Sequence, residues 1–479
     1  RLNDNVSGKK WTSVSVGRVM TCVLGMVVSR EWEIRKFVKT PFYRVIGSFG
    51  REQTDEEEAA FFESEWRVNE KSKYFQSPKL YKENGFTEES FAKELIDTLM
   101  AGEKQAVVEK VEKKKEKKNP PLLFNLAELQ NLSSKLFKIS PDETLQIVQE
   151  LYEKKLVTYP RTDARVLSTA VAKEIHKNLN GLMQYEPAKP YLQDIVGFGS
   201  HKGLEKTRYV NDKQITDHYA IIPTGQGTGG LKGLPNLSQK VYDVIVRRFL
   251  SIFYPPAVYQ KVAIVTKMKE ESFFSSFKVL AEEGYLKVAG VPGKKSDGED
   301  TDAAFFAKIQ GLKKGMTLPV QSLDIKEGKT SPPKRYNSGS LILAMENAGQ
   351  LIEDEDLREQ IKGSGIGTSA TRAEIVKKLV SNKYIALNKK TQIVTPTLTG
   401  EMIVNVVSAS IGSLLNPTLT ASWEKGLTYV AEGSVTEEEY MQKLDKFVTQ
   451  KTNIVKQNNF QYQLRQSFDQ IAPYYQKKK

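Results

Sequence analysis

The sequence predicts a multidomain protein of the α+β class, in which helical and strand-rich regions occupy separate stretches of the chain. Three observations lead to this prediction. The 479 residues are too many for a single hydrophobic core, so two to four domains are expected. Apolar residues recur at helical spacing near the N-terminus, in the middle of the chain and in its last third. Between these regions lie short β-branched and aromatic runs, which are typical of strands.

The first helical region is predicted over residues 14–37, with an apolar stripe formed by Val16, Val19, Val23 and Val27. Cys22 falls within this pattern, so we expect a buried structural thiol. It is the single cysteine of the chain, which excludes an internal disulfide and a cysteine-rich zinc ribbon.

Residues 42–49 and 105–112 then have the composition of strands. The acidic and aromatic stretch 55–66 between them fits no element clearly. Residues 113–118 are nearly all lysine and precede Asn-Pro-Pro, which predicts a solvated linker at a domain boundary.

The middle region begins with a helix over residues 125–137, where Asn125 and Glu128 form a capping pair. A second helix opens at Ser140, with a proline at the first helical position and a glutamate three residues after the cap. Its apolar pattern comprises Thr144, Val148, Leu151 and Tyr152, and a third helix carries Val171, Ile175 and Leu179. Residues 156–163 lie between these helices.

A second strand-rich region follows the helical pattern of residues 234–253, with strands predicted at 262–266, 274–280 and 286–288. We expect it to join the first strand-rich region in one β-rich hinge domain, interrupted by the helical insert. The predicted segments are therefore helical 1–40, β-rich 41–120, helical 121–228, β-rich 229–330 and helical 331–479.

Composition and short motifs indicate which kinds of partner the protein binds. Lys+Arg 71 against Asp+Glu 58 gives a net charge of +13, which favours a polyanionic partner. No apolar run approaches the length of a membrane span, and no signal peptide is visible. The glycine-rich run 363–368 leads into a predicted helix and suits a phosphate, but it is neither a nucleotide P-loop nor a dinucleotide fingerprint.

The run 156–163 (LVTYPRTD) places a tyrosine two residues before an arginine. A phenol oxygen is a poor nucleophile at its usual pKa of about 10, so it needs a nearby positive charge. Arg161 can supply that charge and can grip a phosphate oxygen with its planar guanidinium. If the segment is extended, Tyr159 and Arg161 share one face. Taken alone, such a pair is more typical of a half-buried aromatic beside a solvated charge.

Other candidate residues are equally ambiguous in isolation. Arg18, in the first turn of the first helix, fits an exposed charge, and Thr368 fits a helix cap. Of the three histidines, His176 and His201 are expected to be structural or solvated. His218 precedes an apolar Ala-Ile-Ile-Pro run, where a lone histidine is more often a core or turn residue.

Five stretches together resemble the signatures of type IA DNA topoisomerases, in the order of that family. Residues 156–163 resemble its active-site segment. The others are 15–19 (SVGRV), 217–224 (DHYAIIPT), 330–336 (TSPPKRY) and 365–372 (GIGTSATR). The details resemble the bacterial topoisomerase III-like branch.

The resemblance implies a toroidal core around a hole for duplex DNA, with two helical domains joined by the β-rich hinge domain. It implies that Tyr159 attacks single-stranded DNA and forms a 5′-phosphotyrosine, that Arg161 stabilises the charge on phosphorus, and that strand passage needs no ATP. The DNA-binding residues that it implies are Arg18, Thr162, Asp163, His218, Thr368 and Arg372.

The family's toprim domain, which binds magnesium, precedes the segment that matches residues 15–19 and is expected to be missing or on another polypeptide. The acidic runs 297–302 and 353–356 lack the strand context of its metal site, so no metal ligand is expected in this chain. We expect a monomeric, cytoplasmic bacterial protein that binds single-stranded DNA but cannot relax DNA alone.

The sequence bears on three alternative functions. A tyrosine recombinase needs His-x-x-Arg, and a rolling-circle relaxase needs a His-hydrophobe-His pair; neither pattern is present. A non-catalytic clamp for single-stranded DNA stays open.

Overall fold

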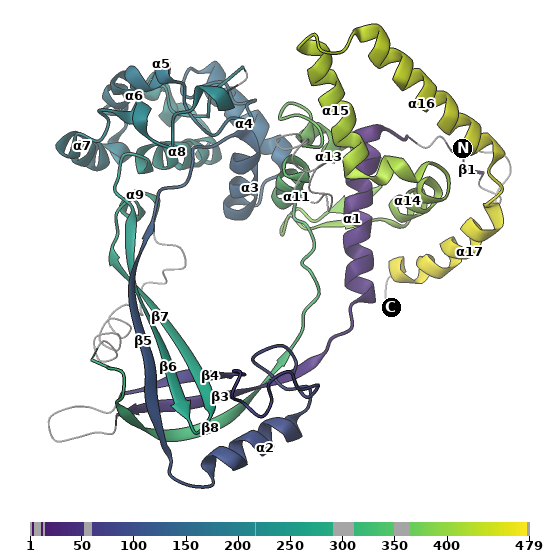
Figure 1. Ribbon diagram of the computed structural model, residues 1–479. Coiled ribbons are helices and arrows are strands. Elements are labelled where there is room, and N and C mark those ends of the chain that lie inside the picture. Colours follow the sequence, from purple (N-terminus) through teal and green to yellow (C-terminus); the bar gives the residue numbers. More distant parts are fainter. Residues whose placement is uncertain are drawn as a thin grey trace. The chain divides into compact units, whose positions relative to one another are not determined.

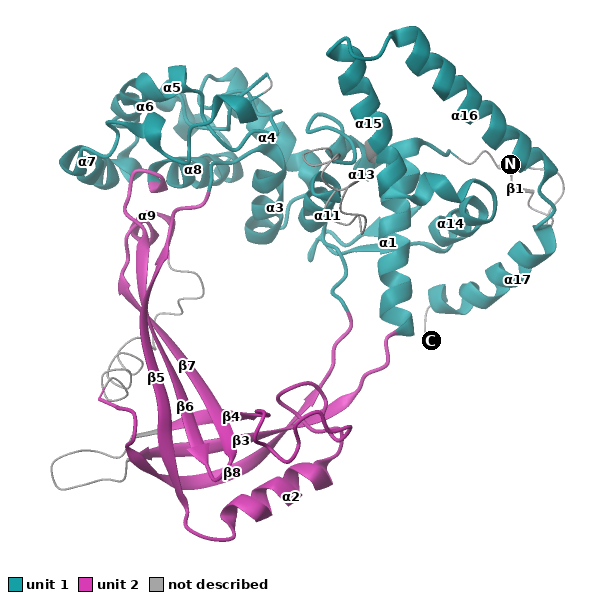
Figure 2. Cartoon of the chain, in the orientation of Figure 1, with its two compact units in different colours: residues 1–36, 122–250, 333–479 teal, residues 37–121, 251–332 magenta. Residues whose placement is uncertain are grey.

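The computed structural model of the chain describes residues 2–3, 11–12, 15–51, 60–215, 217–290, 311–348 and 365–476. The chain forms two compact units (Figure 2): one comprises Arg1–Lys36, Leu122–Leu250 and Pro333–Lys479, and the other comprises Phe37–Pro121 and Ser251–Pro332. Each unit is assembled from segments that are far apart in the sequence. The two acidic runs expected to be solvated loops, 297–302 and 353–356, lie outside the described residues.

The second unit is built on a closed antiparallel barrel (Figure 1). Its strands are β3 (Pro41–Arg51), β4 (Ala60–Arg67), β5 (Gln105–Lys118), β6 (Ala257–Met268), β7 (Glu271–Glu282) and β8 (Thr317–Lys329). They follow the order β3-β4-β7-β6-β5-β8, and pairing of β8 with β3 closes the barrel. Both strand-rich stretches of the sequence therefore contribute to one sheet.

Aromatic side chains fill much of the barrel core. Phe49 and Phe273 meet edge to face at 5.0 Å, and the fully buried Trp66 stacks on Phe86 at 4.8 Å. Helix α2 (Glu89–Met100) adds Leu95 to this core. Phe49, Trp66 and Phe273 come from strands β3, β4 and β7, on the inward-facing side of the pleat.

Two sequence predictions in this unit were wrong. The lysine-rich residues 113–118 are not a linker but the second half of β5, with Lys113 opposite Val262 and Lys118 opposite Ala257 on β6. Backbone pairing holds such a strand while its lysine side chains stay in water. Residues 286–288 are not a strand, because they belong to the short helix α9 (Leu286–Ala289).

The first unit is mainly helical. Its helices are α1 (Arg18–Lys36), α3 (Leu126–Phe137), α4 (Pro141–Glu153), α5 (Thr169–Lys173), α6 (Ile175–Leu182), α7 (Lys189–Phe198), α8 (Asn236–Ser251), α11 (Ser338–Glu346), α13 (Arg372–Ser381), α14 (Leu398–Ile411), α15 (Pro417–Ala431), α16 (Glu437–Gln457) and α17 (Gln461–Ile471). The predicted caps are confirmed: the Asn125 side chain accepts the Glu128 N–H, and Ser140 with Glu143 forms a capping box.

Helix α1 runs through a core that it shares with α11, α13 and α14. Cys22, Val23 and Val27 pack there beside Leu341 and Val404. Cys22 is fully buried, as predicted, and this burial raises the pKa of its thiol to about 11. Val16 does not extend the buried stripe, because the helix begins only at Arg18 and Val16 is exposed.

Three further observations refine the expected organisation. Helix α8 groups with the helical unit, so the second β-rich segment begins at Ser251 and not at residue 229. A small hairpin, β9 (Ile385–Leu387) with β10 (Val394–Pro396), interrupts the last helical stretch. Among the described residues, Leu398–Leu415 is long and apolar enough to cross a membrane, but its residues Ile403 and Val407 lie in the core of this unit. These two residues belong to the buried face of the segment.

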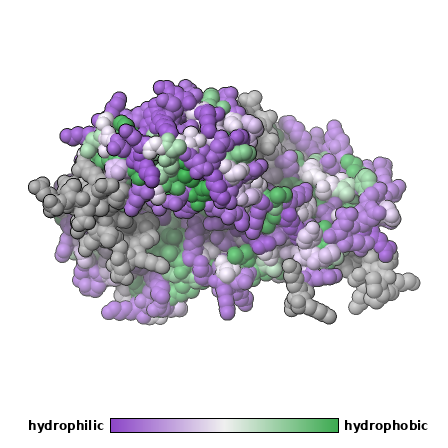
Figure 3. Space-filling model, turned by 90° about the horizontal axis from the view of Figure 1, so that it is seen from below, coloured by the Kyte–Doolittle hydropathy of each residue, from purple (hydrophilic) through white to green (hydrophobic). Residues whose placement is uncertain are grey.

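The surface in Figure 3 is largely hydrophilic, with hydrophobic residues in small separate patches. With a net charge of +13, such a surface favours an anionic partner over an apolar one.

Candidate active site

The segment that contains Tyr159 is held against residues 218–224 by hydrogen bonds directly before the tyrosine. The hydroxyl of Thr158 donates to the carbonyl oxygen of Ala220 at 3.0 Å and accepts the N–H of Ile222 at 2.9 Å. The N–H of Thr158 donates to the carbonyl oxygen of Ile222 at 3.0 Å. One threonine thus fixes the register between two motifs that are separated in the sequence.

His218 lies directly beside Tyr159. The two ring centroids are 4.3 Å apart, with their planes tilted by 43°. The hydroxyl of Thr162 donates to the carbonyl oxygen of His218 at 2.9 Å and accepts the N–H of Ala164 at 3.1 Å. Because Thr162 is only 4% exposed, these contacts give it a supporting role under His218.

The polar groups at this point are available to a ligand. Tyr159 and Arg161 are half-buried, and His218 is exposed. Within the described ranges, the Tyr159 hydroxyl, the Arg161 guanidinium and the His218 ring nitrogens make no hydrogen bond or ion pair. Tyr159 and Arg161 stand on one short segment, and the imidazole of His218 lies beside the phenol. Phenol, guanidinium and imidazole groups with unused hydrogen-bonding capacity suit a phosphate group.

A second tyrosine borders the site. The ring of Tyr152, near the end of α4, meets the ring of Tyr159 edge to face with centroids 5.4 Å apart. The helical pattern placed Tyr152 among apolar positions, but its side chain is 38% exposed. Periodicity alone could not identify it, because the spacing of Tyr152 is the same whether it faces the core or the edge of a site.

Arg372, at the start of α13, has a different environment from Arg161. It is 4% exposed, although the resemblance assigned it to DNA. Its Nη1 lies 2.8 Å from Oδ1 of Asp163, and its Nη2 donates to the carbonyl oxygen of Gly367 at 3.0 Å. The structure thus brings Arg372 and Asp163 together, with the guanidinium turned to protein acceptors.

Arg18 is also paired within the protein. Its Nη2 lies 2.6 Å from Oε1 of Glu424 on α15, and its Nη1 donates to the carbonyl oxygen of Thr420 at 2.8 Å. The side chain keeps 31% exposure. Arg18 therefore links α1 to α15 and presents only part of its guanidinium to solvent.

Thr368 lies in an exposed turn that precedes α13. Its N–H donates to the hydroxyl of Thr371 at 3.0 Å, and its carbonyl oxygen accepts the N–H of Arg372 at 3.0 Å. Gly367 has a φ of +69°, which favours glycine, and a Cβ added there would lie 3.5 Å from Cγ1 of Val19. The glycine-rich turn and the start of α1 are therefore neighbours.

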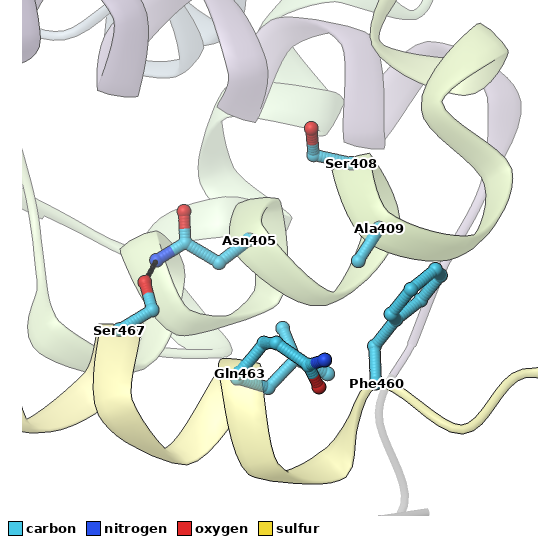
Figure 4. Close-up of a pocket in the computed structure, with 7 residues that line it drawn as sticks. Asn405, Ser408, Ala409, Phe460, Gln463 and Ser467 are labelled. Carbon is cyan, nitrogen blue, oxygen red and sulfur yellow. Dashed lines mark hydrogen bonds between the residues drawn. The ribbon is translucent and has the colours of Figure 1, made fainter.

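Neither a group of metal ligands nor the recess described below belongs to the neighbourhood of Tyr159 in the described part of the chain. Among the described residues, no group of three or more His, Cys, Asp or Glu side chains could hold a metal ion. A shallow recess of about 460 Å³ lies between α14 and α17 and is lined by Asn405, Phe460 and Ser467 among others (Figure 4). None of its lining residues belongs to the motifs around Tyr159, so it is not the catalytic candidate.

Sequence reasoning missed the contacts of two polar residues near the site, the buried Asn125 and the partly buried Glu346. Glu346, the last residue of α11, lies 3.8 Å from Nη1 of Arg372 and accepts a hydrogen bond from Nδ2 of Asn125 at 2.6 Å. Asn125 was recognised only as a cap. The sequence shows Glu346 only as a single glutamate at the end of an apolar helix. It does not show that Arg372 and Asn125 are the partners of this glutamate.

Comparisons with known proteins show which family and which fold the chain resembles. A family model described as DNA topoisomerase matches residues 2–442. The chain is 32% identical to DNA topoisomerase 3 of Bacillus subtilis (strain 168) and 31% identical to DNA topoisomerase 3 of Bacillus licheniformis; each match covers 93% of this chain and 57% of the relative. The chain thus spans little more than half the length of these relatives.

A solved structure has a similar fold. Full-length topoisomerase I from Thermotoga maritima superimposes with a TM-score of 0.63 at 23% sequence identity, and the match covers 92% of this chain and 63% of that one. At this identity the similarity concerns the fold alone.

Proposed function

The chain belongs to the type IA DNA topoisomerase family, and from this premise we propose that it carries the nucleophile for transient cleavage of single-stranded DNA. The Oη atom of Tyr159 attacks the phosphorus of a phosphodiester. The new bond joins Oη to the 5′-phosphate, and the bond from phosphorus to the 3′ oxygen breaks. The phenol loses its proton, and the leaving 3′ oxygen gains one and becomes a hydroxyl. Reversal of the same step reseals the strand.

The observation that carries this proposal is the set of unpaired polar groups around Tyr159. Among the residues that the structure describes, the half-buried phenol of Tyr159 and the guanidinium two residues later have no hydrogen-bond partner, and the phenol lies against the exposed imidazole of His218. Arg161 stabilises the negative charge that grows on the phosphate oxygens, as positioned cationic donors do in phosphoryl transfer. His218 binds the phosphate or moves the proton.

The phosphotyrosine bond conserves the energy of the broken phosphodiester, so resealing needs no ATP. In the longer protein, we propose that strand passage through the open break changes DNA topology, and that the barrel acts as the hinge. We propose that the magnesium ion on which the family depends binds to a toprim domain and not to the described residues of this chain. The roles proposed for Tyr159, Arg161 and His218 do not include binding a metal ion.

We further propose that this chain binds single-stranded DNA as a monomer in the bacterial cytoplasm. Alone it is not expected to relax supercoiled DNA. A magnesium-dependent relaxation assay on the purified chain is expected to show no activity, and relaxation by the chain alone would contradict the assignment of toprim to another part of the protein.

The test of the nucleophile is a covalent adduct. An oligonucleotide labelled at either its 5′ or its 3′ end is incubated with the chain, alone and supplemented with a toprim-containing segment of a relative, and the reaction is stopped with denaturant. A slow-migrating protein band should retain the label of the 3′ side of the break, because the protein holds the 5′-phosphate.

Tyr159→Phe should abolish this band, and Tyr152→Phe, which changes the neighbouring phenol only, should retain it. A single-stranded DNA clamp without catalytic function is the alternative: it predicts equal DNA binding by all three proteins and no covalent band from any of them.

A further inference from the structure

Arg372 is a buried cation whose donors are directed at protein acceptors. Its side chain is 5% exposed, and Nη1 lies 2.8 Å from Oδ1 of Asp163. Nη2 donates to the carbonyl oxygen of Gly367 at 3.0 Å, and Nε donates to that of Ile366 at 3.4 Å. A buried guanidinium is tolerated only when it is paired and hydrogen-bonded, so these contacts set its orientation.

Two further polar side chains complete the group. Oε1 of Glu346 lies 3.8 Å from Nη1 of Arg372 and accepts from Nδ2 of Asn125 at 2.6 Å. Asn125 also donates to the backbone carbonyl oxygen of Asp163 at 3.1 Å. We name Asn125, Asp163, Glu346 and Arg372 the Arg372 cluster. Asp163 is held in it by both its carboxylate and its backbone.

The cluster joins the segment of the nucleophile to the second part of the helical unit. Asp163 follows Tyr159 by four residues, and the carbonyl oxygen of Thr162 accepts the N–H of Leu126 at 3.1 Å. Glu346 ends α11 and Arg372 begins α13. Each member therefore comes from a different element, and together they fix where residue 163 lies.

Close packing behind the cluster keeps these elements in place. A Cβ added to Gly339 of α11 would lie 2.6 Å from Cα of Asn131 in α3, so the two helices touch through their backbones. The hydroxyls of Ser134 and Ser338 meet across the same contact at 3.2 Å. Such small residues permit little slack between α3 and α11.

We propose that Arg372 is a positioning residue, not a phosphate ligand. Through Asp163 it fixes the segment that carries Tyr159 against α11 and α13, so that Oη is presented to the phosphate in one geometry. The contribution to the nucleophile rests on the proposed function, whereas the pairing of Arg372 with Asp163 does not. Removal of any cluster side chain frees the segment without removing a DNA contact.

The first test compares the salt dependence of DNA binding. Binding of a fluorescent single-stranded oligothymidine is measured by anisotropy over a range of salt for the unaltered chain, Arg372→Gln and Arg161→Gln. The slope of log K against log salt should be unchanged in Arg372→Gln and smaller by about 0.7 in Arg161→Gln, the value for one lost phosphate contact on a single strand. A slope reduced by about 0.7 in Arg372→Gln would overturn the proposal.

The second test needs no DNA. Denaturant midpoints are measured for Asp163→Asn, Arg372→Gln and the double variant. Because Asp163 is half exposed and Asn has the same shape, Asp163→Asn is expected to fold in any case. The double variant should lose less than the sum of the single losses. Losses that simply add would show that the two side chains are not coupled.

The third test measures positioning through the covalent adduct. Asp163→Asn and Arg372→Gln should each slow adduct formation at saturating oligonucleotide by about 10- to 100-fold while the half-saturating concentration stays the same. Arg372→Lys should not restore the rate, because an ammonium cannot reach the acceptors of a planar fork. Full rescue by lysine would overturn the proposal. If the unaltered chain forms no adduct, the proposed function fails, and the first two tests still decide the role of Arg372.

Discussion

The two arginines on either side of the site, Arg161 and Arg372, differ in what surrounds them. Arg161 follows Tyr159, the proposed nucleophile, by two residues, and its guanidinium has no hydrogen-bond or ion-pair partner within the described part of the chain. Arg372 is almost completely buried and directs its donors at Asp163 and at two backbone carbonyl oxygens. The same family resemblance had assigned Arg161 a catalytic role at the phosphorus atom and Arg372 a role in DNA binding.

The difference shows that the unused hydrogen-bonding capacity of a side chain, and not its presence in a motif, indicates a ligand contact. A guanidinium has five donors, and those already used by protein acceptors cannot bind phosphate without breaking native bonds. Arg18 is intermediate, because it is paired with Glu424 but remains partly exposed.

The largest expected effect is the loss of rate in adduct formation that Arg161→Gln should cause. Loss of a donor aimed at the reacting phosphate should lower the rate of adduct formation by about 100- to 1,000-fold. The same change should alter the free energy of unfolding by no more than about 0.5 kcal/mol, because the Arg161 side chain makes no hydrogen bond or ion pair with the described part of the chain. Single-turnover adduct formation and urea unfolding measure the two effects.

A matched control is Arg208→Gln, which removes an arginine whose ring contact is with its neighbour Tyr209, outside the motifs. A similar loss of rate in this control would show that general charge, and not the position of Arg161, sets the rate.

Arg372→Gln should show the opposite pattern in stability. Removing one partner of a buried ion pair leaves Glu346 without its cation, at a cost of about 3 kcal/mol in the free energy of unfolding. Urea unfolding measures this cost, with Arg161→Gln as the reference. Equal stability of the two variants would remove the basis of the comparison.

A smaller effect is expected from Thr158→Val. The side chain keeps its shape but loses the hydroxyl that bonds Ala220 and Ile222, which should cost about 1–3 kcal/mol in the free energy of unfolding. Since the register of the segment before Tyr159 is loosened, the rate of adduct formation should fall as well. Thr169→Val, at an exposed helix start, is the control. A Thr158→Val protein as active as the parent would mean that other contacts set this register.

Local features of the fold were predictable from the sequence because their causes lie within a few residues. The capping box at Ser140 and the cap at Asn125 each depend on a partner three residues away. The burial of Cys22 followed from the valine pattern around it. Tyr159 and Arg161 were found because both stand in one short motif.

Long-range pairing was not predictable in this way. The strand made by residues 113–118 depends on β6, which follows it by more than a hundred residues, and the lysines themselves favour solvent. The burial of Arg372 depends on Asp163, 209 residues earlier. Neither partner leaves a mark on the local sequence, so the lysine run was interpreted as a linker and Arg372 as a DNA contact.

The smallest expected effect is the pH dependence of stability that Glu346 contributes beside Arg372. Burial raises the pKa of this carboxyl, while the neighbouring charge of Arg372 acts in the opposite direction. A carboxyl whose pKa is raised in the folded state contributes stability below its ordinary value of 4.5, and this contribution is lost as the pH rises through the raised pKa. Glu346→Gln keeps an acceptor for Asn125 but has no such dependence.

Urea unfolding of the parent and of Glu346→Gln should therefore agree below pH 4.5 and diverge above it, with the glutamine variant the more stable at neutral pH. In the Arg372→Gln background the divergence should grow, because the cation that lowers the pKa of Glu346 is gone. If the parent were instead the more stable at neutral pH, the pairing with Arg372 would outweigh the burial of Glu346. The cluster would then be held together mainly by its charges and not by the geometry of its hydrogen bonds.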